Sequence, residues 1–207
     1  MYSIKEIYKT IQGEGGQAGR TAVFVRFSGC NLWSGLEKHR SAAVCKFCDT
    51  DFVGTDRLNG GKYNAVTLSQ KIQEIWGAGS NKLIVFTGGE PMLQLDLELI
   101  EECKNKGFET AIETNGTINI SFDIDWICVS PKANAELMIK KGNELKVVFP
   151  QPEQDLHSFL DLNFEHFFLQ PMDGPQIKEN TQETIEYCMQ HPQWRLSIQQ
   201  HKLLGIA

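Results

Sequence analysis

Short runs of apolar and β-branched residues recur along the chain, and most of them are followed by polar residues. The seven clearest runs span 21–27, 82–88, 108–114, 125–131, 143–150, 165–171 and 194–200. Each run has the length and the flanking turn residues that are typical of a strand buried in a sheet. The pattern therefore predicts seven strands.

Helical patterns lie between several of these runs. The four predicted helices cover 67–79, 93–107, 152–162 and 180–192. The first begins with the capping pattern Thr67-x-x-Gln70, and the second ends at Gly107. Strands that alternate with helices usually pair in parallel, but here seven strands have only four helices to cover them. We therefore predict an α/β fold, an incomplete (partial) TIM-like barrel with reduced helices, and expect residues 1–207 to form one domain.

Composition limits the function classes. The formal net charge of -6 argues against a general surface for polyanions, so we expect a small-molecule substrate and no direct binding of nucleic acid. The N-terminus has no signal-peptide pattern, and no run approaches the roughly 20 apolar residues of a membrane span. We expect a cytoplasmic protein with no membrane contact. Cys103, Cys128 and Cys188 lie singly in predicted helices or strands, and we interpret them as core residues.

Polar residues follow most of the predicted strands. They form the segments Gly88–Pro91, Glu113–Gly116, Ser130–Lys132, Gln170–Asp173 and Gln199–His201. Barrels and open parallel sheets place their active sites at the carboxyl ends of their strands. We therefore expect an active site at this edge of the sheet.

The remaining cysteines stand close together in a loop after the first predicted strand. Cys30 is followed by fourteen residues and then by the pair Cys45 and Cys48. With His39 they would make a Cys3His zinc site, and the C-x-x-C pair alone is compatible with redox chemistry. A third interpretation is an iron–sulfur cluster with three thiolate ligands and one open iron, which S-adenosylmethionine can chelate.

The loop and one strand end resemble the radical S-adenosylmethionine (SAM) superfamily. The usual loop of that superfamily is C-x3-C-x2-C with an aromatic residue before the last cysteine. This chain keeps Cys45-Lys46-Phe47-Cys48 but stretches the first spacing to fourteen residues, and it carries Thr87-Gly88-Gly89-Glu90-Pro91, similar to the motif that binds the methionine amino group. The resemblance implies a partial barrel of the radical SAM type that holds a 4Fe-4S cluster and SAM.

Further motifs are similar to those of the 7-carboxy-7-deazaguanine synthase family, and some of its members also have a stretched loop. These motifs are IQGEG, GR, VFVRFSGCNLW, CDT, ETNG, CVSPK, NELKVV and QPMDG, and the likeness runs from about residue 4 to the C-terminus. The family converts 6-carboxy-5,6,7,8-tetrahydropterin to 7-carboxy-7-deazaguanine with loss of ammonia, on the route to queuosine in tRNA. The resemblance implies a lyase that uses SAM catalytically with assistance from Mg2+, receives electrons from a donor such as flavodoxin or ferredoxin, and forms a homodimer.

The resemblance also assigns site residues. Cys30, Cys45 and Cys48 would hold the cluster, and Thr50 would bind Mg2+. SAM would be bound by Phe47, Asp49, Gly88, Gly89, Glu90, Glu113, Asn115, Ser130, Lys132, Gln170, Met172 and Asp173. The pterin would be bound by Ile11, Gln12, Gly13, Glu14, Arg26, Thr87, His201 and Ala207. No side chain is expected as a catalytic base, because the 5'-deoxyadenosyl radical removes the hydrogen from C6.

Two alternatives and one departure accompany this interpretation. An activase of glycyl-radical enzymes shares the cysteine triplet, and a non-catalytic zinc or iron–sulfur binding protein would leave the strand-end motif unexplained. The departure is the segment after Cys48, whose many glycines and polar residues predict no helix up to residue 66. The first crossover is therefore expected to be reduced, and the cysteine loop to be covered by the fourteen-residue insertion or by a second subunit.

Overall fold

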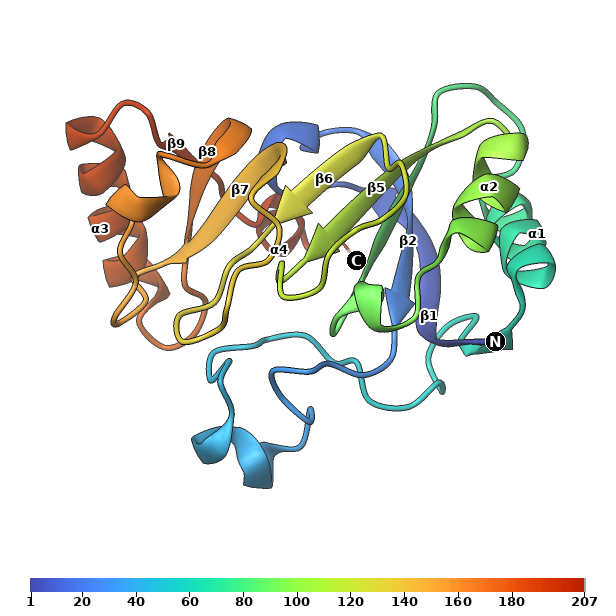
Figure 1. Cartoon of the computed structure of the whole chain (residues 1–207), viewed down its shortest axis with the longest axis horizontal. Helices are drawn as coiled ribbons and strands as arrows, with labels where there is room; N and C mark the ends of the chain where they lie inside the picture. The colour runs from blue at the N-terminus through green and yellow to red at the C-terminus, as the bar shows by residue number, and fades with distance from the viewer. Residues whose placement is uncertain (207) are drawn as a thin grey trace.

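The computed structural model describes residues 1–206, so the expectation for Ala207 lies outside the described residues. Nine strands form one sheet in the order β3-β1-β2-β4-β5-β6-β7-β8-β9. The parallel strands are β2 (Thr21–Phe27), β4 (Lys82–Gly88), β5 (Phe108–Thr114), β6 (Trp126–Val129), β7 (Lys141–Phe149), β8 (Asn163–Pro171) and β9 (Arg195–Leu196). These correspond to the seven predicted strands. The sheet stays open between its outer strands, which confirms the predicted α/β fold with an incomplete barrel (Figure 1).

Two further strands were not predicted. β1 (Tyr2–Ile11) pairs antiparallel with β2, and β3 (Gly61–Tyr63) pairs antiparallel with β1. In β1 the buried Ile4 and Ile7 are three residues apart because a register shift interrupts the pairing between Ile4 and Glu6. That irregularity breaks the period of two by which a half-buried strand is recognised in sequence.

Within residues 1–206, four α-helices and four 3-10 helices accompany the sheet. They are α1 (Ala65–Trp76), α2 (Leu97–Asn105), α3 (Ile177–Gln190) and α4 (Gln200–Leu204), with η1 (Gly15–Gln17), η2 (Glu37–Ala42), η3 (Pro91–Leu93) and η4 (His157–Phe159). Figure 1 shows α1 and α2 together at one end of the sheet and α3 at the other. The first helix begins earlier than predicted, because Asn64 rather than Thr67 is the N-cap and the two side chains form a capping box.

One predicted helix is wrong, and the last predicted strand is shorter than expected. The helix expected over 152–162 is reduced to η4. The Asp155 carboxylate accepts a hydrogen bond from the backbone N–H of His157, and Glu153 has a φ of 67°, so local bonding competes with the helix. The strand expected over 194–200 contains only the two residues of β9, and the chain then enters α4.

The strands divide their side chains between a helix-covered core and a cavity. In β2, Val23 and Val25 are buried in the core that also contains residues of α1 and α2, whereas Arg26 lines the cavity. In β7, Leu145 belongs to a second core and Lys146 lines the same cavity. Because successive residues of a strand point to opposite faces, the parallel strands bring polar side chains together on the cavity side.

The segment from residue 28 to residue 60 lies below the carboxyl ends of the strands in the view of Figure 1. Its only helical part is η2, which confirms that no helix follows Cys48 directly, and α1 begins at Ala65 and completes the crossover to β4. Among residues 1–206 no helix combines the length and apolar character needed to cross a membrane.

Candidate active site

A cavity of about 510 Å³ opens at the carboxyl ends of the parallel strands. Its wall includes residues of β1, β2, of the strand ends from β4 to β8, of the cysteine loop and of α4. The predicted site residues that line it are Ile11, Gln12, Gly13, Glu14, Arg26, Cys30, Cys45, Phe47, Cys48, Asp49, Thr50, Thr87, Gly88, Gly89, Glu113, Asn115, Ser130, Lys132, Gln170, Asp173 and His201. The structure thus brings together residues that are almost two hundred positions apart in sequence.

Two predicted SAM-binding residues do not line this cavity. Glu90 is fully buried, and its carboxylate accepts hydrogen bonds from the Thr114 hydroxyl and from the backbone N–H groups of Asn115 and Met92. Met172 follows β8, and its backbone N–H donates to the carbonyl of Phe149. In this arrangement Glu90 joins the ends of β4 and β5, and its contact with a ligand stays a prediction.

The three loop cysteines are free thiols at one end of the cavity. The Cys45 thiol donates a hydrogen bond to Cys48, which lowers the pKa of Cys48 to about 6 although burial alone would raise it. The same hydrogen bond and burial raise the pKa of Cys45. Among the described residues no group of three Cys, His, Asp or Glu side chains has the geometry to hold a single metal ion.

His39, the fourth ligand of the zinc alternative, is engaged elsewhere. It is exposed in η2, its Nδ1 is 2.8 Å from the Ser34 hydroxyl, and it does not line the cavity. A 4Fe-4S cluster with three protein ligands needs only the three thiols, each bound to a different iron, and does not need His39.

The fourteen-residue insertion packs on the cysteine loop. Arg40 donates hydrogen bonds to the carbonyl oxygens of Lys46 (2.9 Å) and Cys48 (3.1 Å). Its guanidinium also lies 4.0 Å from the ring centroid of Trp33, which packs edge-on against Phe52. Of the two expected sources of cover for the loop, the insertion is the one that the structure provides.

The strand-end motif approaches the cysteine loop closely. A Cβ atom at Gly89 would lie 2.1 Å from the backbone oxygen of Gly29 and 2.7 Å from the Cβ of Cys30. The backbone N–H of Glu90 donates to the same Gly29 oxygen. Only glycine permits this approach, so the motif and the loop are held as one unit.

Further polar residues continue along the same side of the cavity. Lys132 is half-buried, and its ammonium group donates to the carbonyl and the hydroxyl of Ser130 at 2.6 and 2.7 Å. Burial lowers the pKa of Lys132, and the thiols of Cys45 and Cys48 oppose that shift. The Lys132 ammonium is 6.0 Å from the ring centroid of Phe47.

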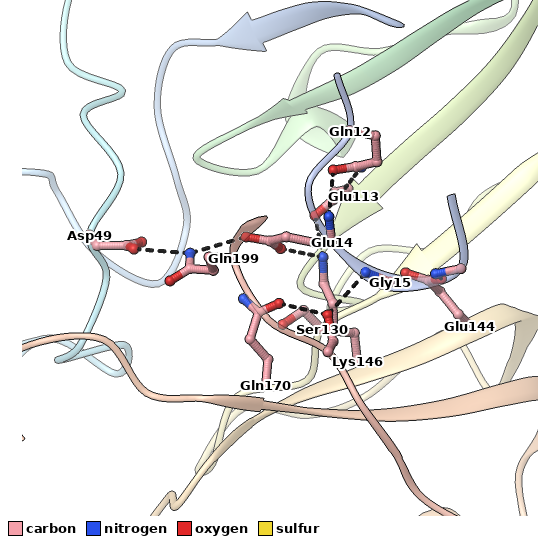
Figure 2. Close-up of polar contacts among 12 residues, drawn as sticks. Gln12, Glu14, Gly15, Asp49, Glu113, Ser130, Glu144, Lys146, Gln170 and Gln199 are labelled. Atoms are coloured by element: carbon pink, nitrogen blue, oxygen red, sulfur yellow. Dashed lines mark hydrogen bonds and ion pairs between the residues drawn. The ribbon is translucent and has the colours of Figure 1, made fainter. Parts of the chain in front are cut away.

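The cavity also contains an ionic network of one buried lysine and two half-buried carboxylates, shown in Figure 2. Lys146 donates to Glu14 at 2.6 Å and to Glu113 at 2.9 Å, and the side-chain amide of Gln12 also donates to Glu113, at 2.8 Å. Burial would raise the pKa of Glu14, but the charge of Lys146 and hydrogen bonds from Lys146 and Gln199 outweigh it and lower the pKa to about 2. Glu113, predicted beside SAM, therefore lies with two predicted pterin residues.

The loop that carries Glu14 is held by two hydrogen bonds of its backbone, next to Gly15 and Glu144 in Figure 2. The backbone N–H of Gly16 donates to the buried Glu144 carboxylate at 2.6 Å, and the N–H of Gly15 donates to the Ser197 hydroxyl at 3.0 Å. Gly15 has a φ of 61°, and a Cβ there would lie 2.2 Å from a Glu144 oxygen. The last glycine of the IQGEG motif is therefore required by its close contact with Glu144.

Arg26 is placed by two residues of β1. It donates to Glu6 at 2.7 Å and to the Tyr8 hydroxyl at 2.9 Å, and it lines the cavity with both of them. Arg26 therefore pairs with a carboxylate of the protein and faces the cavity. Glu6 and Tyr8 were missed because β1 was not predicted.

The C-terminal helix closes one side of the cavity. Lys202 pairs with Asp49 at 2.5 Å and with Asp173 at 2.6 Å. The side-chain amide of Gln199 donates to Glu14 at 3.0 Å, and the backbone N–H of Gln200 donates to the carbonyl oxygen of Gly13. Asp49 and Asp173, two of the four acidic residues predicted for SAM, thus have a partner on α4.

Comparison with known proteins defines the class. A family model described as "Radical SAM superfamily" matches residues 39–191. The match covers more than half of the chain, so the protein belongs to the class of radical SAM proteins. Proteins of this class use a 4Fe-4S cluster and SAM.

Individual relatives narrow the family. The chain is 58% identical over 207 residues to 7-carboxy-7-deazaguanine synthase of Burkholderia multivorans and 56% identical over 207 residues to that of Bordetella pertussis, with 99% of both chains covered in each case. The crystal structure of QueE from Escherichia coli matches with a TM-score of 0.73 at 26% identity, covering 96% of this chain and 93% of that one. The chain belongs to the 7-carboxy-7-deazaguanine synthase family.

Proposed function

We propose that the protein is a radical SAM lyase that converts 6-carboxy-5,6,7,8-tetrahydropterin to 7-carboxy-7-deazaguanine in the biosynthesis of queuosine for tRNA modification. The observation that carries the proposal is that one cavity is lined by the three-cysteine loop together with Glu14 and Arg26. It offers thiols for the cluster, and a carboxylate and a guanidinium that suit a pterin with a carboxyl group. Loss of ammonia balances the reaction, so SAM is not consumed.

The donor set of the loop suits a 4Fe-4S cluster with Cys30, Cys45 and Cys48 as ligands. All three are free thiols on one cavity wall, and the low pKa of Cys48 supplies a thiolate near neutral pH. When bound, the cluster and SAM supply the electron and the group that abstracts a hydrogen from the substrate. Arg40 orients the loop, and the Gly89 backbone lies against it.

The SAM-facing wall consists of the strand ends and the loop. We propose that it comprises Phe47, Asp49, Gly88, Gly89, Asn115, Ser130, Lys132, Gln170 and Asp173, with Glu90 and Met172 supporting it. Asn115 is oriented by a 2.9 Å hydrogen bond to Asn31, and Ser130 by its bond to Lys132. Asp49 and Asp173 both form ion pairs with Lys202. They can contact a ligand only if these ion pairs break or if the ligand joins them.

The substrate-facing wall is proposed to consist of Ile11, Gln12, Gly13, Glu14, Arg26, Thr87 and His201, and the role of Ala207, outside the described residues, stays a prediction. A carboxylate accepts two hydrogen bonds from the guanidine-like edge of a pterin, and a guanidinium donates two to a substrate carboxylate. Glu14 and Arg26 supply these complementary groups. Tyr8 and Glu6 orient Arg26.

Thr50 is proposed as a ligand of Mg2+. Thr50 lines the cavity, and Mg2+ prefers oxygen ligands and keeps several waters or substrate oxygens. The neighbouring Asp51 is paired with Lys5 and Arg57, and the proposal therefore assigns the ion to Thr50 and the substrate carboxylate.

The remaining proposals concern assembly and location. We propose one domain, because one sheet runs from Tyr2 to Leu196. A homodimer is supported by the exposed Leu203 and Leu204 of α4, and light scattering of the purified protein tests it. A flavodoxin or ferredoxin is proposed as electron donor, and the cytoplasm as the compartment, because a cluster with an open iron requires reducing conditions.

An anaerobic turnover assay tests the proposed function. Reconstituted protein is mixed with dithionite, SAM, Mg2+ and 6-carboxy-5,6,7,8-tetrahydropterin, and the product is identified by mass spectrometry. We expect 7-carboxy-7-deazaguanine in excess over the SAM consumed. Formation of 5'-deoxyadenosine without this product would contradict the pterin assignment.

A further inference from the structure

Lys146 is a buried cation in the active-site cavity to which the preceding assignments give no role. Only 3% of its side chain is exposed, and it lies between Glu14 and Glu113 in Figure 2. The second oxygen of each carboxylate accepts a hydrogen bond from a side-chain amide: Gln199 donates to Glu14, and Gln12 donates to Glu113. The three ionised groups carry one net negative charge, and all three line the cavity.

The arrangement is stable only with the cation in place. Two carboxylates that share a buried site without a cation repel each other, and one of them takes up a proton near neutral pH. A protonated carboxyl group presents a donor where a pterin edge also presents donors. The pair would then lose part of its capacity to accept hydrogen bonds from the ligand.

We propose that Lys146 is a positioning residue that holds Glu14 and Glu113 together as a pair of ionised acceptors for the guanidine-like edge of the substrate. The inference rests on the proposed function and extends it, because it moves Glu113 from the SAM side to the substrate side. Lys146 touches the two acceptors and acts through them.

Other titratable groups lie near this pair: Glu144 on β7, Cys128 on β6 and His201 on α4. Burial raises the pKa of the Cys128 thiol well above its ordinary value, so this thiol stays neutral. For Glu14, the positive charge and the hydrogen bond of Lys146 outweigh the effect of burial, so the pKa of Glu14 is low. The charges of Glu113 and Glu14 in turn raise the pKa of Lys146 well above its ordinary value although burial would lower it, so the ammonium stays charged across the neutral range.

Binding of 6-carboxypterin, a fluorescent and unreactive analogue, tests the proposal. The dissociation constant is measured on reconstituted holoenzyme with SAM and Mg2+ from pH 6.0 to 7.5, for the wild type and for Lys146→Gln. We expect a constant that changes less than twofold with pH in the wild type. In Lys146→Gln we expect binding to be about tenfold weaker at pH 6.0 than at pH 7.5, because the uncompensated pair holds a proton.

Three further variants separate positioning from packing. Lys146→Arg keeps the charge and should restore the flat pH profile. Lys141→Gln, the same change at an exposed site of the same strand, should behave as the wild type. If Lys146→Gln does not fold, the double variant with Glu113→Gln removes the repulsion, and the buried Glu14 alone should still give a pH-dependent loss.

The outcomes are distinct. A loss of binding in Lys146→Gln by the same factor at every pH would overturn the inference and leave the proposed function intact. A wild type that holds SAM but does not bind 6-carboxypterin at all would overturn the proposed substrate and the inference with it.

Discussion

Replacement of Arg40 by alanine should loosen the cysteine loop before any cluster is bound. Arg40 holds the carbonyl oxygens of Lys46 and Cys48 and covers the face of Trp33. Hydrogen bonds from charged donors contribute about 1.5–3 kcal/mol each, and a cation–π contact at an exposed site about 0.5–1 kcal/mol. The ion pair with Glu37 adds little, because 76% of the Glu37 side chain is exposed.

These contributions have to be reduced for solvent access. The Arg40 side chain is 27% exposed, and water can replace it at both carbonyl groups once it is removed. We therefore expect a net loss of about 2 kcal/mol for the closed loop, which is about a 30-fold change in its opening equilibrium. The sheet does not depend on Arg40, so the global stability should change much less.

Hydrogen exchange of the apoprotein measures this opening directly. The backbone N–H groups of Val44 and Cys45 donate to the carbonyl oxygen of Leu32 inside the same loop, and their exchange should become about 30-fold faster in Arg40→Ala. Lys38→Ala, an exposed change in the same insertion, serves as the control. Exchange at Val44 and Cys45 that stays within threefold of the wild type would refute the role assigned to the insertion.

Three other changes have defined outcomes. Gly89→Ala places a Cβ 2.1 Å from the Gly29 oxygen, so the loop must shift. We expect the free energy of unfolding to fall by about 1–3 kcal/mol in thermal unfolding, and iron analysis to find less iron per chain after reconstitution. An unchanged iron content would refute this prediction. The folded-state pKa of Glu14 is lowered to about 2 from 4.5, so its ionised form stabilises the fold above pH 4.5 and the contribution disappears as the pH falls through 2. Urea unfolding should therefore show a larger loss of stability for the wild type than for Glu14→Gln over that window, by at most about 3 kcal/mol, and parallel curves would contradict this. Asn64→Ala removes the capping box of α1 and should cost about 1 kcal/mol, or about 2–4 °C in Tm, without changing turnover; an unchanged Tm would show that the cap contributes nothing.

Much of the fold could be predicted because the parallel strands are buried and read as apolar runs. β1 was not predicted because its register shift breaks the alternation of buried residues at Ile4 and Ile7. The partners of Arg26 lie on β1 and were therefore not predicted either. The segment 152–162 has a helical pattern of apolar residues, but the side chain of Asp155 bonds its own backbone two residues on. The periodicity of apolar residues does not report such local hydrogen bonds, which compete with helix formation.

The site residues were predicted best where a motif carries them. Lys146 lies in the motif NELKVV between the core residues Leu145 and Val147. Because side chains alternate along a strand, this position faces away from the core, and that alternation could have identified Lys146 as a residue of the cavity. Its partners on other strands could not be read from spacing, because they depend on the order of strands in the sheet. Lys202 was missed because the strand expected up to residue 200 concealed α4.

The central claim is that Cys30, Cys45 and Cys48 hold a cluster that supports ring contraction of the pterin. The most direct measurement compares the wild type with Cys45→Ala and with the matched control Cys188→Ala, for iron and sulfide content and for anaerobic formation of 7-carboxy-7-deazaguanine. The account predicts four irons per chain and product for the wild type and for Cys188→Ala, and neither an intact cluster nor product for Cys45→Ala. Product formation by Cys45→Ala, or a fully loaded wild type that makes none, would contradict it.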